Sequence, residues 1–279
     1  MKKISFIFFV LLFYSCSTKK ENEKIILGDV QVRYHQLGEG EFPRQNDVIS
    51  ASILITNENM DTIHYVPDYP YFFKIGNSKV DSIFMYMQAG DSISFKVKRA
   101  LLNEYFKFYQ LLKSDSGNAI LNIKLNEIFS DEQKAKDAEF KLLSKRELDE
   151  QAALNKLLKV NFTDFENIRG VYRKITHKTD GIPIAYGDEL TINYIGRFLD
   201  GYVFDNTYLK GRAPSFIYGK DYQLIDGIHY GLIGMKEGES VKIILTSRRA
   251  FGEEGSIAGI VPPFTTVIFE INIIKVTKK

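Results

Sequence analysis

The chain is poor in the residue types that form disulfides and metal sites. Its 279 residues include no tryptophan, one cysteine and four histidines. The single cysteine, Cys16, cannot form a disulfide within the chain. The histidines, His35, His64, His177 and His229, are scattered without the spacing of metal ligands, and no glycine-rich phosphate loop is present. The sequence therefore predicts no metal and no cofactor.

An excess of charge of either sign is also lacking. The chain has 37 Lys and Arg against 35 Asp and Glu, a net charge of +2 at pH 7. No basic block gives an electrostatic reason to bind nucleic acid, so nucleic acid is not among the predicted partners. The composition, 44% hydrophobic and 26% charged, is that of an ordinary globular protein, and the length suffices for two domains.

The long apolar run at the N-terminus predicts a targeting segment. Two lysines precede the run Ile4 to Tyr14, which is too short to span a bilayer. Ser15 and Cys16 follow, and a small residue before a lone cysteine resembles a bacterial lipobox. The resemblance implies a signal peptide at 1–15, lipid on Cys16, a tether at 16–24 and a protein anchored to a membrane of the bacterial envelope, facing the periplasm or the surface. The alternative is an ordinary secretory signal with a chance cysteine.

A long helix is predicted at 130–160, between two segments that are richer in strand-forming residues. The stretch Asp131 to Val160 is rich in Lys, Glu, Ala and Leu and contains no Gly or Pro. Ser130 with Asp131 can cap its N-terminus. Apolar residues recur at helical spacing between Leu142 and Leu158. The helix is interpreted as a linker packed on one domain, with a dimerisation helix as the alternative.

The last segment, 167–279, contains the most informative run of the chain, Tyr194 to Asp205. An aromatic-Gly strand end, the turn Asp200-Gly201 and a return ending in Phe204-Asp205 predict a β-hairpin. Further strands, rich in β-branched and aromatic residues, are predicted at Val171–Thr176, Glu189–Phe198, Val241–Thr246 and Val267–Val276. A short apolar stretch at 224–235 suits a helix packed across a sheet.

Four shorter motifs follow this run in a fixed order. They are Leu224-Ile225-Asp226-Gly227, Ala250-Phe251-Gly252, Ile260-Val261-Pro262-Pro263 and Phe269. In this order and at these spacings, the set resembles the FKBP-type peptidyl-prolyl cis-trans isomerases over about the last 110 residues. The resemblance implies an α+β fold, in which a half-open antiparallel sheet wraps a short helix. It also implies proline-containing flexible polypeptides as substrates and a role in the folding of envelope or secreted proteins.

The resemblance assigns a role to ten residues of the last segment. The residues implied in catalysis are Tyr194, Phe204, Asp205, Ile225, Phe251 and Phe269. Those implied in substrate binding are Leu224, Ile228, Ile260 and Val261. Taken one at a time, the apolar residues among them are also typical of a core, a tyrosine can be a core tyrosine, and an aspartate can cap the next turn.

Two positions depart from the best-known family members. The floor of the pocket, often Trp, is Ile228, and Phe251 stands where many members have a Tyr whose hydroxyl holds a substrate carbonyl. Loss of one neutral hydrogen bond costs roughly 0.5–1.5 kcal/mol, which predicts a weaker enzyme. The alternative function is a non-catalytic scaffold or chaperone binding module.

The first segment, 25–129, shows matches to the last one. Asn46 to Ile53 aligns with Gly187 to Tyr194, and Met87 to Ile93 aligns with Met235 to Val241. These matches predict a degenerate second copy of the same fold, so that two tandem copies flank the long helix; the alternative is an unrelated β-rich domain.

The first segment lacks the site residues of the last one. Ile53 stands in place of Tyr194, and Ile63-His64 in place of Phe204-Asp205. A helix at Arg99 to Asp115 is predicted where the last segment has Ile-Val-Pro-Pro. The first segment is therefore interpreted as a binding or spacing module.

Overall fold

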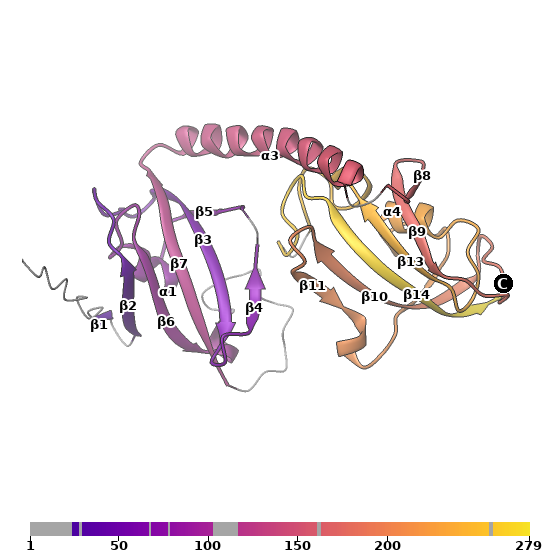
Figure 1. The fold of residues 1–279 in the computed structure, drawn as a ribbon. Helices are drawn as coiled ribbons and strands as arrows, with labels where there is room; N and C mark the ends of the chain where they lie inside the picture. The colour runs from indigo at the N-terminus through magenta and orange to yellow at the C-terminus, as the bar shows by residue number, and fades with distance from the viewer. Residues whose placement is uncertain are drawn as a thin grey trace, which may run out of the picture.

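The protein consists of two antiparallel sheets joined by one long helix, α3 (Glu132–Val160) (Figure 1). The computed structural model describes residues 24–27, 30–66, 68–77, 79–102, 117–160, 163–256 and 259–279. The predicted α+β fold, with two tandem units around a long helix, is confirmed. Within the described ranges, no helix combines the length and the apolar character needed to cross a membrane.

The predicted signal peptide, the lipidation residue Cys16 and the tether up to residue 23 lie outside the described residues. So does most of the predicted helix Arg99 to Asp115, of which only the 3-10 turn η1 (Arg99–Leu101) and Leu102 are described.

The described residues of the first domain, between 24 and 129, form seven strands and a short helix. They are β1 (Lys24–Leu27), β2 (Val30–Gln36), β3 (Val48–Asn57), β4 (Thr62–Tyr65), β5 (Tyr71–Lys74), α1 (Lys79–Phe84), β6 (Ser92–Lys98) and β7 (Asn118–Phe129).

The second domain, residues 163–279, contains the same number of strands around one short helix. They are β8 (Glu166–Ile168), β9 (Val171–His177), β10 (Glu189–Phe198), β11 (Val203–Asn206), β12 (Ser215–Ile217), α4 (Asp226–Gly231), β13 (Ser240–Leu245) and β14 (Val267–Thr277). Two 3-10 turns, η3 (Thr207–Lys210) and η4 (Ser247–Arg249), complete it. The four predicted strands correspond to β9, β10, β13 and β14.

The two sheets have the same topology. The strand order is β1-β2-β6-β7-β3-β4 with β5 on β3 in the first sheet, and β8-β9-β13-β14-β10-β11 with β12 on β10 in the second. Each domain therefore follows the same path along the chain, with its short helix before the last two strands. The predicted internal repeat is confirmed at the level of topology.

Equivalent turns also use equivalent hydrogen bonds. The residue two positions before the third strand is left-handed in both domains, with φ of 73° at Asn46 and 92° at Gly187. Its N–H donates to the carbonyl oxygen of Ile75 at 3.0 Å in the first domain and of Tyr218 at 2.9 Å in the second. Such backbone hydrogen bonds depend on the register of the strands. The two domains therefore share more than the alternation of buried and exposed residues that any two β-rich domains have.

Each domain buries one face of its sheet against its short helix. Strand β6 alternates, with Ile93, Phe95 and Val97 buried and the serines and lysines between them more exposed. In the second domain, Ile228 of α4 is 2% exposed and packs in one core with strand residues such as Ile243. Each such fully buried aliphatic side chain contributes about 1.5–3 kcal/mol.

Helix α3 begins where the sequence predicts. The Asp131 side chain accepts from the N–H of Gln133 at 2.8 Å, as an N-terminal cap does. Only Ala135 is buried along the 29 residues of the helix, and Leu148 is 70% exposed. The helix therefore joins two cores, as predicted, and lies mostly in solvent. It does not pack on one domain alone, because Glu132 pairs with Lys74 of the first domain and Glu150 accepts from Ser247 of the second.

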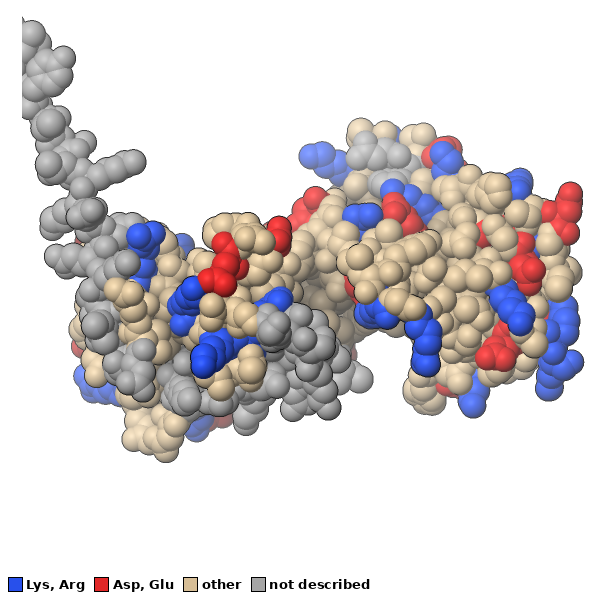
Figure 2. All heavy atoms as spheres, turned by 90° about the horizontal axis from the view of Figure 1, so that it is seen from below, with Lys and Arg blue, Asp and Glu red and all other residues tan. Residues whose placement is uncertain are grey.

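Charges of both signs are mixed on the face of the molecule that Figure 2 shows. Figure 2 shows acidic and basic side chains interspersed over one face of both domains, with a hollow between the domains. This pattern agrees with the near balance of 37 basic and 35 acidic residues.

Candidate active site

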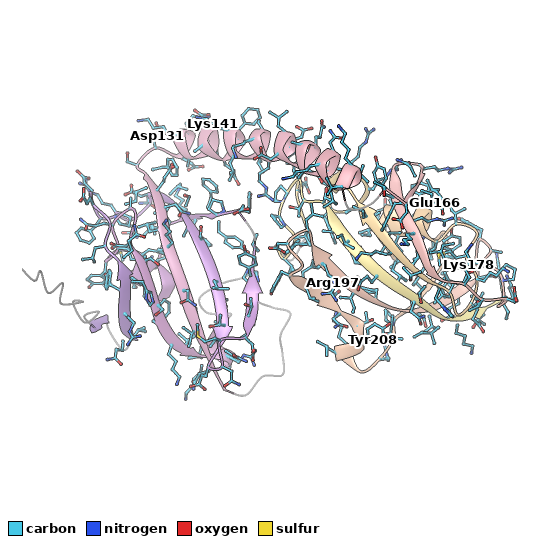
Figure 3. All side chains as sticks on the ribbon, viewed as in Figure 1. Asp131, Lys141, Glu166, Lys178, Arg197 and Tyr208 are labelled. Carbon is cyan, nitrogen blue, oxygen red and sulfur yellow. The ribbon has the colours of Figure 1, made fainter. Side chains whose placement is uncertain are left out.

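The predicted hairpin forms the strand pair β10–β11. The N–H of Phe198 donates to the carbonyl oxygen of Tyr202 at 2.9 Å, and the Asp200 side chain accepts from the N–H of Tyr202 at 2.9 Å. Gly201, with a φ of 94°, adopts the left-handed conformation that this turn requires. Figure 3 shows Arg197 of β10 at the end of the second sheet that faces the first domain, so the hairpin lies on that side.

Tyr194 and Asp205 come together across this strand pair. The Tyr194 hydroxyl donates to a carboxylate oxygen of Asp205 at 2.8 Å, and Lys210 Nζ lies 2.5 Å from the other oxygen. Burial, and then the adjacent Asp205 charge, raise the pKa of Tyr194 far above its usual value, so the phenol remains a donor. The cap of the neighbouring turn η3 is Asn206, whose side chain accepts from the N–H of Tyr208. Asp205 is therefore not the residue that caps this turn.

Aromatic rings surround Phe204. Its ring centroid lies 5.8 Å from that of Phe269 and 6.4 Å from that of Phe251, both edge to face, and 5.0 Å from that of Phe198. Tyr194 meets Phe269 edge to face at 5.7 Å. Four residues predicted from three separate motifs, Tyr194, Phe204, Phe251 and Phe269, therefore form one aromatic cluster, which Phe198 extends.

Gly196 makes the close approach of these rings possible. The register of the sheet places Gly196 beside Phe269. A Cβ atom at Gly196 would lie 2.7 Å from two ring atoms of Phe204 and 3.1 Å from Phe269, closer than carbon atoms pack. Any side chain here would displace these two rings. The sequence analysis did not single out Gly196, although a glycine inside a strand often marks a close approach.

The start of α4 supplies another wall. Leu224 and Ile225 are half-buried, pack against the core and precede the helix, which spans only Asp226–Gly231. The predicted helix over 224–235 is thus too long, because Gly234 adopts a left-handed φ of 72° that ends helical continuation. Ile225 has an extended backbone, and Ile228, one turn into the helix, forms the buried floor.

The segment after η4 brings in the last predicted residues. Val261 is 1% exposed, and its N–H donates to the Ser256 hydroxyl while its carbonyl accepts from the Ser256 N–H, both at 2.8 Å. Ile260 lies half-buried beside it. Phe251, half-buried, presents an unsubstituted ring edge where a tyrosine would carry a hydroxyl. All ten predicted residues thus belong to the second domain's core or its rim, and Val261 and Ile228 lie beneath the surface.

The equivalent region of the first domain is filled. Ile55 is the first-domain equivalent of Gly196. Strand pairing places Ile55 between Leu121 and His64. In the second domain, Gly196 lies between Phe269 and Asp205 in the same way. Ile55 is completely buried. The first domain therefore lacks the predicted site residues, and it also has the buried side chain of Ile55 at the position where the second domain has Gly196.

Three further residues contact the predicted site residues or the segment that carries them, and the sequence did not predict them. Lys210 pairs with Asp205 across a short turn, and Arg146 and Glu150 of α3 bond to the segment that carries Phe251. The α3 contacts span about 100 residues of chain, and no local pattern marks them.

Comparison with known proteins identifies the family of the second domain. Residues 182–274 match the model of a family described as FKBP-type peptidyl-prolyl cis-trans isomerase. The chain is 34% identical over 110 residues to the peptidyl-prolyl cis-trans isomerase Mip of Coxiella burnetii, covering 39% of this chain and 46% of that protein. It is 39% identical over 90 residues to an FK506-binding protein of Neisseria meningitidis serogroup C, covering 32% of this chain and 81% of that protein. It is also 32% identical over 122 residues to the peptidyl-prolyl cis-trans isomerase FKBP2 of Bos taurus, covering 43% of this chain and 86% of that protein.

Proposed function

We propose that this chain, which belongs to the FKBP-type peptidyl-prolyl cis-trans isomerase family, catalyses isomerisation of the peptide bond before proline in flexible polypeptides. The observation that carries this proposal is the convergence of one hydrogen-bonded pair and three rings on the same side of the second sheet. The pair is Tyr194 and Asp205, and the rings are Phe204, Phe251 and Phe269.

The chemistry requires a shaped apolar site and no reactive group. A prolyl bond isomerises over a barrier of about 20 kcal/mol, because the amide loses resonance as it twists. A protein that binds the twisted amide better than the planar one lowers this barrier. Phe204 and Phe269 provide edges and faces suited to the pyrrolidine ring, and their apolar surroundings strip water from the imide, which favours the less polar twisted state.

The polar groups have distinct roles in this proposal. The protonated Tyr194 hydroxyl and the Lys210 ammonium hold the Asp205 carboxylate at the pocket wall. The N–H of Ile225, where the chain enters α4, is the proposed donor to a substrate carbonyl. Because Phe251 lacks a hydroxyl, a second such donor is missing, and a modest catalytic efficiency is expected.

The test is a protease-coupled isomerisation assay of the full chain on a prolyl tetrapeptide. The proposed enzyme increases the observed rate in proportion to its concentration, and Phe204→Ala abolishes most of the increase. The second candidate, a non-catalytic scaffold, is favoured by Phe251 and by the filled first domain. It would be supported by a folded wild-type protein that is no faster than the uncatalysed reaction.

Anchoring to a membrane is part of the proposal. It is supported by the sequence alone, in which Cys16 directly follows an apolar run and one small residue. A lipid-anchored protein of the bacterial envelope would act there on folding envelope or secreted proteins. Cys16→Ala should move the protein from the membrane fraction to the soluble fraction, and a wild type that takes up no lipid label would refute the anchor.

A further inference from the structure

The segment between η4 and β14 carries three predicted site residues, Phe251, Ile260 and Val261. Its described parts, 250–256 and 259–266, belong to no strand or helix. Phe251 meets Phe204 edge to face at 6.4 Å, so the position of this segment decides where one wall of the pocket stands. The segment has a few hydrogen bonds of its own, such as that from the N–H of Phe264 to the carbonyl oxygen of Gly252 at 3.1 Å. Outside a sheet or helix such bonds are few, so contacts from other elements add to its local stability.

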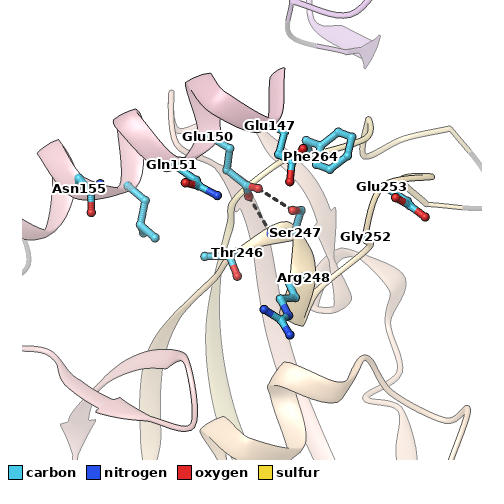
Figure 4. Close-up of a pocket in the computed structure, with 11 residues that line it drawn as sticks. Glu147, Glu150, Gln151, Asn155, Thr246, Ser247, Arg248, Gly252, Glu253 and Phe264 are labelled. Carbon is cyan, nitrogen blue, oxygen red and sulfur yellow. Dashed lines mark hydrogen bonds between the residues drawn. The ribbon is translucent and has the colours of Figure 1, made fainter. Parts of the chain in front are cut away.

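Glu150 of α3 holds both ends of the segment. One carboxylate oxygen accepts from the N–H of Ser247 and from the Thr266 hydroxyl, each at 2.7 Å, and the other accepts from the Ser247 hydroxyl at 2.5 Å. Ser247 and Thr266 are only 5% and 3% exposed, so few other partners can satisfy them. Figure 4 shows the Glu150–Ser247 bonds in the wall of a cavity of about 660 Å³ between α3 and η4.

Arg146 lies one turn earlier on the same side of α3 and holds the C-terminal part of the segment. Its Nε donates to the carbonyl oxygen of Pro263 at 3.0 Å, and Nη2 donates to the Thr265 hydroxyl at 2.8 Å. The remaining Nη1 donates to the carbonyl oxygen of Asp68 in the first domain at 2.8 Å. One guanidinium therefore joins the segment, the helix and the first domain.

The first domain adds two contacts of its own. The Tyr71 hydroxyl donates to the carbonyl oxygen of Gly259 at 3.3 Å, next to Ile260. The ring of Tyr69 lies under the Arg146 guanidinium, 5.4 Å from centroid to Cζ, as in a cation–π pair. The first domain thus reaches the segment through Tyr71 at the start of β5, and reaches Arg146 through the loop before β5.

We propose that Arg146 and Glu150 are positioning residues of the isomerase site, and that the first domain serves as the support against which they hold the Phe251 segment. This inference rests on the proposed function. The hydrogen bonds of Arg146 and Glu150 go to Asp68, Ser247, Pro263, Thr265 and Thr266, and not to the aromatic cluster. The two side chains act through the backbone and hydroxyl groups of the segment, and thereby fix the distance between Phe251 and Phe204.

The test compares four full-length proteins: wild type, Glu150→Ala, Glu150→Gln and Lys145→Ala. Glu150→Ala removes all three acceptor contacts, whereas the amide oxygen of Glu150→Gln can still accept from Ser247 and Thr266. Lys145, beside Arg146 in sequence, forms an exposed pair with Asp149 and is the matched control. Each protein is measured by isomerase kcat/KM and by amide hydrogen exchange at 259–264, where Gly259, Ile260, Val261 and Phe264 carry a backbone N–H and the two prolines do not.

Glu150→Ala should lower kcat/KM about tenfold and speed exchange at 259–264, since displacement of a catalytic group by about 1 Å can cost up to a hundredfold. Glu150→Gln should retain most of both properties, and Lys145→Ala should match the wild type. If Glu150→Ala fails to fold, Tyr71→Phe is tested in its place. This variant removes the hydroxyl that donates to Gly259, so it should also speed exchange at 259–264 and lower kcat/KM.

Two results would overturn the positioning role while leaving the enzyme intact. One is unchanged exchange in the variants; the other is faster exchange with unchanged kcat/KM. A folded wild type without isomerase activity is a different result, because it refutes the proposed function and removes the positioning role with it.

Discussion

Replacing Gly196 by alanine should damage the site by crowding it. The added Cβ would lie 2.7 Å from two atoms of the Phe204 ring and 3.1 Å from Phe269. Carbon atoms in ordinary contact are about 3.5–4.0 Å apart, so the Phe204 ring must move by roughly 1 Å. Overpacking of this kind costs about 1–3 kcal/mol. The lower entropy of the unfolded alanine chain offsets about 0.4–1 kcal/mol of that.

The expected result is therefore a small loss of stability with a large loss of activity. The free energy of unfolding should fall by about 0.5–2 kcal/mol in urea titration. The kcat/KM on a prolyl tetrapeptide should fall about 10–100-fold, because the displaced ring no longer meets the substrate in the productive geometry.

A matched control is available in the first domain. A Cβ at Gly76 would meet only Asp81 Oδ2, at an ordinary 3.5 Å, so Gly76→Ala should leave kcat/KM unchanged. The reasoning is refuted if Gly196→Ala folds and is as active as the wild type, because the ring spacing would then not define the pocket.

Three further predictions concern single side chains. Asp205→Ala should lower kcat/KM about tenfold with little change in the free energy of unfolding, since the side chain is 27% exposed and carries little packing; unchanged kcat/KM would leave Asp205 only a structural role. Phe251→Tyr should raise kcat/KM about two- to tenfold by adding one hydrogen bond, and no gain in an otherwise active enzyme would refute the missing-donor interpretation. Burial lowers the pKa of His64 to about 4. Between about pH 4 and 6.5 the unfolded chain therefore binds more protons than the folded one, and stability of the first domain should fall by up to about 3 kcal/mol as the pH is lowered through this range. Denaturant titrations at several pH values should show this loss in the wild type and in His177→Gln but not in His64→Gln; equal slopes in all three would contradict it.

Local patterns were sufficient for most of the fold. The Asp200-Gly201 turn depends on two residues and their backbone preferences, so it could be predicted from sequence. The same holds for the cap at Asp131 and for the alternating strand β10. The ends of the short helix could not be placed, because the apolar stretch continues past both of them, to Leu224 on one side and Met235 on the other.

The sequence by itself determined the family, the tandem arrangement and the residue types of the site, because motif order and turn chemistry are properties of neighbouring residues. The tertiary structure decided how those residues meet. Gly196 matters because strand register places it beside Phe269, and Ile55 fills the same place in the first domain. Arg146 and Glu150 matter because α3 lies against a segment about 100 residues away in the chain. Contacts at such separations depend on how whole elements pack, and no local sequence pattern encodes that packing.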